Sequence, residues 1–476
     1  MRLSRAALAS LPPAVRRPAY DLDAVRIGVV HLGPGAFHRA HQACYLDDLL
    51  ETDPRSGVCA VSLKSPGVRD ALQPQDGLFT VAELEAETRL RVVGSIRELL
   101  VAPEQPEAVL DRLASPEVRL VTLTITEKGY CLTPDGALDE THPDVRADLS
   151  GASAPSSAPG WLVAGLRRRR DASAGGLTLL SCDNLQDNGA RLRRAVLGFA
   201  ERTDPDLARW IRAETRFPAA MVDSITPATD DALRARVAGA LGCDDAWPVQ
   251  REAFRQWVVE DDLGPDMPDL ASVGVQLTAD VAAWESAKLR LLNGAHSTLA
   301  YVGLLRGRET VADAMADRDL AAVVERMMRE DVVPTLGPTP GLDLQAYASD
   351  VLARFRNPAI RHLLSQIAWD GSQKLPFRVL GTIGDALTAG RPLDRLALPV
   401  AAWMRFVVAR SREGAPLVDP LAEPLAALGS RATGGAADVE LFLAERRVFP
   451  VEVAAADAFR QAARAAYVRL PDLPLP

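Results

Sequence analysis

The chain has 476 residues, which is long for one domain and predicts two or three. Hydrophobic residues make up 48% of it and charged residues 25%, so there is enough apolar material for large cores. The net charge of −9 gives no support for a nucleic-acid surface, and no run of about 18 apolar residues predicts a membrane span. Five scattered cysteines without a C-x-x-C pair favour a reducing compartment, and we expect the protein to be cytoplasmic.

Predicted strands and helices alternate through the first half of the chain. Strands are expected at residues 26–32, 57–63, 119–126 and 176–181, and helices at residues 40–50, 106–114 and from about 185 to 202. Residues 78–84 and 89–93 alternate in polarity and predict an inserted hairpin. Alternation of strands and helices is typical of a parallel sheet covered by helices. We therefore predict a Rossmann-like α/β domain over residues 1–278.

Long helical periods dominate the chain from about residue 281 onward. Helices are expected at residues 280–306, 309–330 and 342–354, with loops rich in proline and glycine at residues 333–341 and 414–424. The pattern predicts a mainly α-helical second domain, residues 279–476. Within the first half, residues 151–160 are expected to form a surface loop, and the basic run Arg167–Arg170 the solvated end of a helix.

A glycine-containing segment follows the first predicted strand. Gly33 and Gly35 stand between that strand and a predicted helix, which is the context that a dinucleotide-binding loop requires. The first glycine permits a tight turn, and the second lets backbone N–H groups approach a pyrophosphate. The third glycine of the usual pattern is replaced by His38, so the motif alone is weak. We assign Gly33, Gly35, Ala36 and Phe37 to cofactor binding.

The end of the second predicted strand bears on which nicotinamide cofactor is used. A carboxylate commonly stands there to bind the adenosine ribose of NAD. Residues 62–65 read Ser-Leu-Lys-Ser and contain no carboxylate. Lys64 would suit a 2′-phosphate, although a solvated loop lysine explains it equally well. We predict NAD as cofactor and leave NADP open.

Four polar residues recur along the predicted helix at residues 280–306. At about 100° per residue, Glu285, Lys288, Asn293 and His296 fall within an arc of about 140° that also holds leucines. Burial disfavours a charged lysine, so Lys288 is a candidate general base. Asn293 can donate to a developing oxyanion, and His296 can orient a substrate hydroxyl. An amphipathic helix with a snorkelling lysine and a hydrogen-bonded histidine is the simpler alternative.

Seven segments in a fixed order resemble the polyol-specific long-chain dehydrogenases. This family includes mannitol 2-dehydrogenase, D-arabinitol dehydrogenase and fructuronate reductase. The resemblance spans residues 26–376, and in its second segment we assign Glu127 and Lys128 to cofactor binding. The segments are HLGPGAFHRAHQACY, TITEKGYC, SCDNLQDNG, MVDSITP, EAFRQWVVED, KLRLLNGAH and IAWDGSQKLP.

The resemblance implies metal-independent, NAD(P)-linked interconversion of a secondary alcohol and a ketone. In that family the lysine of the K-x4-N-x2-H pattern is the general base, which is Lys288 here. The resemblance makes Asn293 and Asn184 the oxyanion-stabilising pair and His296 a substrate ligand. It also links Glu285, three residues before the lysine, to proton exchange.

The resemblance extends to the substrate-binding residues, where the sequence departs from the family pattern. Asp223 and Lys374 are expected to contact substrate hydroxyls. The arginine that usually follows the aspartate is replaced by Ser224, which removes a positive charge. Gln366 occupies a position that is arginine in mannitol dehydrogenases, and it favours the fructuronate reductase branch. Fructuronate or mannonate is therefore the expected substrate, with mannitol and arabinitol as alternatives.

The sequence also offers two interpretations of a different class. Three histidines near the glycine loop, with a carboxylate close by, resemble a metal site, but their spacing is not compact and we predict no metal. A non-catalytic nucleotide-binding regulator would not need a lysine base and paired asparagines. We expect a monomer that binds a small-molecule substrate and neither nucleic acid nor membrane. The metal-site candidates are His31, His38, His41 and Asp47.

Overall fold

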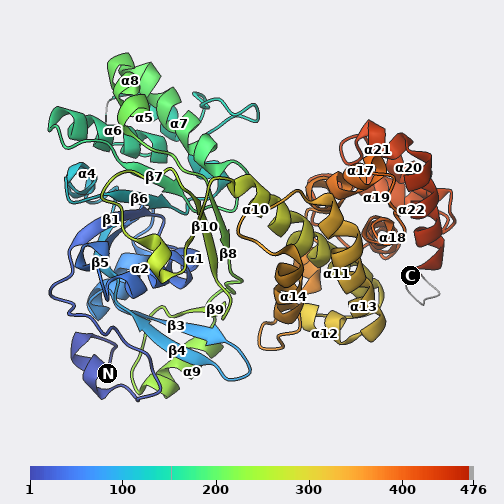
Figure 1. Ribbon diagram of the computed structural model, residues 1–476, viewed down its shortest axis with the longest axis horizontal. Helices are drawn as coiled ribbons and strands as arrows, with labels where there is room; N and C mark the ends of the chain where they lie inside the picture. The colour runs from blue at the N-terminus through green and yellow to red at the C-terminus, as the bar shows by residue number, and fades with distance from the viewer. Residues whose placement is uncertain (152, 471–476) are drawn as a thin grey trace. The chain divides into compact units, whose positions relative to one another are not determined.

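The computed structural model describes residues 1–151 and 153–470, which fold into two compact units. The first unit is Met1–Ala282 and the second is Ala283–Pro476 (Figure 1). The first contains every strand of the described chain, and the second is built from helices. The predicted fold class, a Rossmann-like α/β domain followed by a mainly helical domain, is confirmed. Among the described residues, no helix combines the length and apolar character needed to cross a bilayer.

A five-stranded parallel sheet forms the centre of the first unit. The order of its strands is β5-β2-β1-β6-β7. The first strand, β1, therefore lies between β2, which follows it in sequence, and β6, which comes much later in the chain. The four predicted strands all occur in this sheet, and the edge strand β5 was not predicted. The strands are β1 (Ile27–Leu32), β2 (Gly57–Ser62), β5 (Ile96–Val101), β6 (Leu120–Leu123) and β7 (Thr178–Ser181). Continuous apolar runs explain the predicted strands, because both faces of a parallel sheet are covered.

Helices cover this sheet (Figure 1), and three of them match the helices predicted at residues 40–50, 106–114 and from about 185 to 202. The predicted helix at residues 40–50 is interrupted at His41, whose ψ of −89° leaves the helical region. The predicted loop at residues 151–160 is shorter than expected because α6 begins at Ala158, and one of its residues, Ala152, lies outside the described residues. The helices are α1 (Ala36–Ala40), α2 (Gln42–Leu49), α3 (Gly67–Leu72), α4 (Pro106–Ala114), α5 (Pro143–Ser150), α6 (Ala158–Asp171), α7 (Asn188–Thr203), α8 (Pro205–Glu214) and α9 (Asp231–Leu241).

One residue of the basic run contradicts the prediction of a solvated helix end. Arg169 is only 3% exposed and donates to the carbonyl oxygens of Ser115, Ala174 and Gly175 at 2.6, 2.9 and 2.8 Å. Burial lowers the pKa of its guanidinium to about 10. Arg169 thus ties the end of α6 to the loops before β6 and β7. The buried carbonyl groups of these loops obtain donors that they would otherwise lack.

Two smaller sheets complete the first unit. The predicted hairpin is β3 (Phe79–Leu84) with β4 (Arg89–Val93), and β9 (Val249–Glu252) pairs parallel to β3. In the other sheet, β10 (Gln256–Glu260) pairs antiparallel to β8 (Ala220–Asp223). A short strand, β11 (Gln276–Thr278), adds to β10 in parallel. Apart from the predicted hairpin, these sheets pair strands that are far apart in sequence, such as β3 with β9, and the strand patterns alone did not predict those pairs.

The second unit is a helical assembly around one apolar core. Trp403 and Tyr301 are among its largest buried side chains. The predicted helix at residues 309–330 is divided at Asp317, whose side chain caps the following helix. The helices are α10 (Val281–Ala287), α11 (Gly294–Leu305), α12 (Val311–Ala316), α13 (Arg318–Arg326), α14 (Leu344–Phe355), α15 (Leu364–Ile367), α16 (Gly371–Leu375), α17 (Gly381–Thr388), α18 (Ala397–Arg412), α19 (Ala422–Arg431), α20 (Asp438–Leu443), α21 (Val451–Ala455) and α22 (Asp457–Arg469).

Three segments of the second unit are π-helical. They are η6 (Lys288–Asn293), η7 (Met327–Val332) and η9 (Pro376–Leu380), and each continues an α-helix. A π-turn closes its hydrogen bond over five residues instead of four, and such turns occur frequently at functional sites. The segment η6 contains the candidate base. The helix that carries it is therefore α10, η6 and α11 in succession, not one regular α-helix.

Candidate functional site

The glycine loop follows β1 at the point where the order of strands reverses. Such a switch point, at the carboxyl ends of parallel strands, is where α/β sheets bind ligands. Gly33 has φ +90°, and a Cβ atom there would lie 2.3 Å from the Thr124 carbonyl oxygen. Gly35 is different, because the nearest atom to its ideal Cβ is the Gly33 carbonyl oxygen at 3.9 Å. Glycine at residue 33 is required by the fold, whereas Gly35 leaves open space beside the backbone.

The loop after β6 borders the same switch point and contains Glu127 and Lys128. Both are exposed, in the 3-10 turn η4 (Glu127–Tyr130). Asp183, two residues after the end of β7, accepts from the N–H groups of Ile125 and Thr126 at 3.0 and 2.9 Å and from the Tyr130 hydroxyl. Asp183 therefore fixes the backbone of this loop. Asp183 was not among the predicted site residues, although it stands beside Asn184 in the SCDN segment.

Lys64 lies in the exposed loop after β2. Its side chain is 78% exposed, and its Nζ lies 3.3 Å from a carboxylate oxygen of Asp144. An exposed pair of this kind contributes little to stability and exchanges readily with solvent ions. Lys64 thus has a carboxylate neighbour as well as freedom to move.

The two asparagines of the SCDNLQDNG segment differ sharply in surroundings. Asn188 is fully buried, its amide donates to the carbonyl oxygens of Asp183 and Ala220, and its side-chain oxygen accepts from the Ala220 N–H. It therefore joins the start of α7 to β8. Asn184 is exposed, four residues earlier. A structural role thus explains Asn188 and leaves Asn184 as the candidate for chemistry.

Asp223 ends β8 and is 5% exposed. The residue after it, Ser224, donates its hydroxyl to the Phe254 carbonyl oxygen at 3.0 Å. Ser224 is therefore bound to the neighbouring backbone where the family pattern has an arginine. Asp223 lies near His41, and its charge raises the pKa of that imidazole, although burial is the larger effect.

His31 and His41, two of the histidines that resembled a metal site, are hydrogen-bonded within the core, whereas His38 is held there by ring stacking and both of its ring nitrogens are without a hydrogen-bond partner among the described residues. His31 contacts the Thr122 hydroxyl at 2.7 Å through Nδ1, its ring stacks on His38 at 3.4 Å, and His41 Nε2 lies 2.9 Å from the Gln256 carbonyl oxygen. Burial lowers the pKa of His31 and of His41 to about 3. Asp47 binds Arg91 instead. Within residues 1–151 and 153–470, no group of three or more His, Cys, Asp or Glu side chains is arranged to hold a metal ion.

The candidate base lies in the second unit, where the π-turn changes the predicted geometry. The Gly294 N–H donates to the Leu289 carbonyl five residues earlier. In a regular α-helix, Lys288 and Asn293 would point about 140° apart. A turn that closes over five residues brings side chains five positions apart toward the same side. The helical wheel drawn from the sequence was therefore wrong, and the π-turn moves Lys288 and Asn293 closer together than it predicted.

Burial and ring contacts set the surroundings of this helix. Lys288 is 7% exposed and His296 is 6% exposed. The His296 ring lies 4.5 Å from that of Phe355 and 5.0 Å from that of His362. Its Nε2 has no hydrogen-bond partner among the described residues. Burial, followed by the electrostatic effects of His362, Arg378 and Arg354, lowers the pKa of His296 well below its ordinary value, so the ring is neutral at pH 7.

The remaining predicted residues of this unit are half-buried or exposed. Glu285 is half-buried, about one turn before Lys288 on α10. Lys374, on α16, donates from Nζ to the Ile367 carbonyl oxygen at 3.3 Å, which ties it to the end of α15. Gln366 is exposed on α15, next to that carbonyl. Lys374 and Gln366 thus lie at one junction of two short helices.

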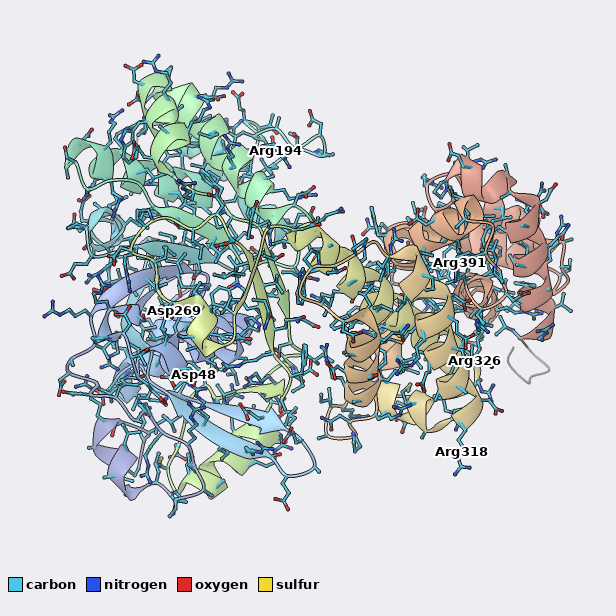
Figure 2. All side chains as sticks on the ribbon, in the orientation of Figure 1. Asp48, Arg194, Asp269, Arg318, Arg326 and Arg391 are labelled. Atoms are coloured by element: carbon cyan, nitrogen blue, oxygen red, sulfur yellow. The ribbon has the colours of Figure 1, made fainter. Side chains whose placement is uncertain are left out.

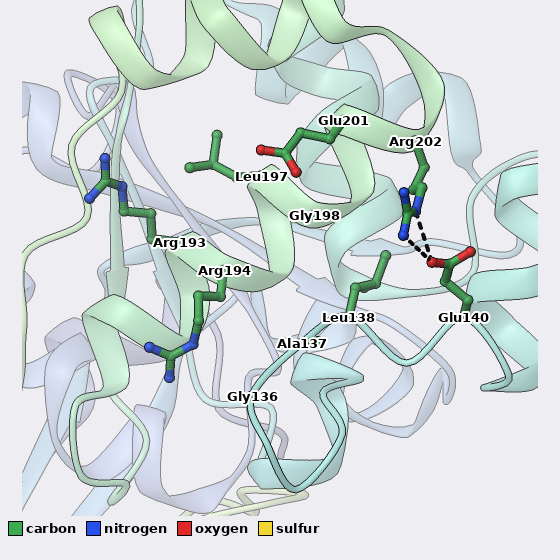
Figure 3. Close-up of a pocket in the computed structure, with 10 residues that line it drawn as sticks. All are labelled: Gly136, Ala137, Leu138, Glu140, Arg193, Arg194, Leu197, Gly198, Glu201 and Arg202. Carbon is green, nitrogen blue, oxygen red and sulfur yellow. Dashed lines mark hydrogen bonds and ion pairs between the residues drawn. The ribbon is translucent and has the colours of Figure 1, made fainter.

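A separate cavity of about 500 Å³ lies in the first unit, between α7 and the loop at residues 136–140 (Figure 3). Leu138 and Leu197 form part of its wall, and Arg202 is bonded to Glu140. Arg193 and Arg194 are exposed at its edge. The cavity contains none of the predicted site residues and no buried titratable group, so it is not the candidate site.

Comparison with known families agrees with this architecture. The family described as the mannitol dehydrogenase Rossmann domain matches residues 27–271. The mannitol dehydrogenase C-terminal domain matches residues 280–471. The resemblance inferred from the seven segments is confirmed.

Relatives of this chain align over most of their own length. D-mannonate oxidoreductase of Escherichia coli (strain K12) is 43% identical over 417 residues, 86% of each chain. Polyol:NADP oxidoreductase of Gluconobacter oxydans (strain 621H) is 40% identical over 419 residues, 87% of this chain and 86% of the relative. The structure of Pseudomonas fluorescens mannitol 2-dehydrogenase with NAD and D-mannitol is 40% identical, with a TM-score of 0.82 over 99% of this chain and 97% of that one.

Proposed function

Because this chain belongs to the mannitol dehydrogenase family, we propose that it is an NAD(P)-dependent oxidoreductase that interconverts a secondary alcohol and a ketone without a metal. The substrate is a polyol or a sugar acid. The observation that carries the proposal is the π-turn at η6, which brings the buried Lys288 toward the side of the helix that presents Asn293. A base and an amide donor near one another are what removal of a hydroxyl proton requires.

The nicotinamide cofactor fits the glycine loop of the first unit. Gly35 leaves room for a ligand beside its backbone, and Gly33 makes the turn that a side chain would obstruct. Glu127 and Lys128 border the same switch point from the loop that Asp183 fixes. The bound cofactor supplies the hydride acceptor. We expect NAD, as in the mannitol 2-dehydrogenase complex, and NADP stays open because a relative is named for it and no carboxylate ends β2.

Separate residues of the protein would accept the proton, stabilise the oxyanion, bind the substrate hydroxyl and release the proton. In our proposal the buried Lys288, as the neutral amine, accepts the proton of the substrate hydroxyl. Asn293 and Asn184 donate to the oxygen as negative charge develops on it. His296, held by Phe355 and neutral, presents Nε2 to a substrate hydroxyl. Glu285 would pass the proton from Lys288 toward solvent.

The substrate that we favour is the mannonate and fructuronate pair. Gln366 replaces the arginine expected in a mannitol dehydrogenase, and a D-mannonate oxidoreductase is 43% identical to this chain. Asp223 and Lys374 would contact the substrate hydroxyls, with Gln366 beside them. Mannitol and arabinitol are the alternatives. The protein itself is expected to act as a monomer in the cytoplasm.

The test is a substrate panel with both cofactors. Purified protein is assayed for NADH and NADPH formation with mannonate, mannitol, arabinitol and sorbitol, and in reverse with the matching ketones. We expect the highest kcat/KM with mannonate and NAD, unchanged by EDTA. Dominant activity on mannitol would reject the sugar-acid assignment while keeping the dehydrogenase. No turnover of either cofactor with any member of the panel would reject the proposed function.

A further inference from the structure

Two cations border the candidate site of the second unit, and neither forms an ion pair with a described carboxylate. Lys374 and Arg378 are four residues apart, across the junction of α16 and η9, and both are half-buried. No carboxylate of the described chain lies within ion-pair distance of either. Like charges at this spacing disfavour the helix that bears them. Placing two like charges on a half-buried surface lowers the stability of the fold. Such an arrangement is typical of a site that binds an anion.

Arg378 borders the residues assigned to catalysis. Its guanidinium donates to the Ser297 hydroxyl at 3.4 Å, which is a long contact and leaves most of its donors available. Its charge helps to lower the pKa of His296 and of Lys374, after burial in both cases. The guanidinium therefore lies close to both groups.

Two carboxylates, those of Asp370 and Asp419, act on Lys374. Asp419 accepts from the N–H and the hydroxyl of Ser372. Asp370 and Asp419 raise the pKa of Lys374 only weakly against the effects of burial and of Arg378. Neither carboxylate affects the pKa of Arg378, which burial lowers.

We propose that Arg378 is a specificity-determining residue that binds the carboxylate of a sugar-acid substrate, with Lys374 beside it. This inference rests on the proposed function and extends it. A guanidinium matches a carboxylate through two parallel hydrogen bonds, which a neutral polyol cannot offer. Arg378 supplies a positive charge within the second unit.

The test compares a sugar acid with a neutral polyol of the same length in wild type and Arg378→Gln. For mannonate we expect kcat/KM to fall by at least about tenfold, mainly through KM, because a charge-assisted contact is lost. For mannitol we expect a change of less than about threefold. Arg378→Lys should recover part of the loss, since it restores the charge without the bidentate geometry.

Two further measurements keep the test informative. Arg391→Gln, in the same unit and bonded to a backbone carbonyl of Glu330, is the matched control and should leave both substrates unaffected (Figure 2). Calorimetry measures mannonate binding with cofactor present in Lys288→Ala, in which turnover is blocked. The affinity should weaken when Arg378→Gln is added to this variant.

Equal losses for mannonate and mannitol, or none for either, would overturn the role of Arg378 and leave the dehydrogenase intact. Absence of turnover by wild type with every substrate would instead reject the proposed function.

Discussion

A methyl group on Gly294 would lie 2.9 Å from the carbonyl oxygen of Arg378. This close approach joins the end of the π-turn η6 to the π-turn η9. Real Cβ atoms essentially never come so near another atom, so any side chain at residue 294 would move one segment or the other. The position of the candidate base therefore depends on a contact between two irregular helices that lie far apart in sequence.

The first prediction concerns this contact. Gly294→Ala should lower kcat by up to about 10²-fold, because a displacement of about 1 Å at the reacting groups can cost that much. Gly381→Ala is the matched control, since the nearest atom to its Cβ is 3.8 Å away and the helix tolerates alanine. Steady-state kinetics and circular dichroism of both variants check it. Normal kcat in a folded Gly294→Ala variant would contradict the importance of the contact.

The second prediction concerns the base. Lys288→Ala should lower kcat by about 10²–10⁴-fold, the usual contribution of general base catalysis. Added primary amines should restore part of the rate. Lys288→Arg should be equally impaired and not rescued, because arginine keeps its proton. Turnover that stays near normal at every pH in Lys288→Ala would exclude this lysine as the base.

The third prediction separates two neighbouring asparagines. Asn184→Ala should cost about 2.7–4 kcal/mol of barrier as an oxyanion donor, with the melting temperature unchanged. Asn188→Ala should instead cost about 1–3 kcal/mol of folding free energy, because it leaves buried backbone groups of Asp183 and Ala220 without partners. Kinetics and thermal unfolding of the two variants are compared. The assignment fails if Asn184→Ala melts early or keeps full activity.

The fourth prediction contrasts the two loop glycines. Gly33→Ala should lose about 1–3 kcal/mol of stability, because φ +90° strains alanine and its Cβ meets the Thr124 carbonyl oxygen. Gly35→Ala should fold normally but bind NADH more weakly, since the new methyl group occupies the space left for the cofactor. Melting curves and NADH fluorescence titrations distinguish them. Unchanged NADH affinity in Gly35→Ala would argue against cofactor binding at this loop.

The fifth prediction follows from the buried histidines. The folded pKa of His41, about 3, lies below the ordinary value of 6.5, so the unfolded chain takes up the proton first on acidification. The neutral His41 ring contributes fully to the free energy of unfolding above about pH 6.5. This contribution is lost as the pH falls toward 3, at about 1.4 kcal/mol per pH unit. Urea unfolding from pH 8 to 4.5 should show this decline, and His41→Gln should reduce its slope. Identical slopes in both proteins, normalised at pH 8, would refute it.

The sequence by itself determined the class of fold and the order of its main elements. Continuous apolar runs fixed β1 and β2, and Pro106 at the first turn marked the start of α4, because these signals act over a few adjacent residues. The seven family segments also singled out Lys288 and Asn293. These features depend on local chemistry, which can be read along the chain.

Only the tertiary structure decided how several of these residues are oriented. The local amino-acid sequence hardly distinguishes a π-turn from an α-turn. The packing of η6 against η9 therefore determines where Lys288 points relative to Asn293. The burial of Arg169 and the bonding of His31 depend on partners distant in sequence. The unbalanced charge of Arg378 likewise appears only when its neighbours are known. Charge, burial and hydrogen bonding are set by surroundings that folding assembles.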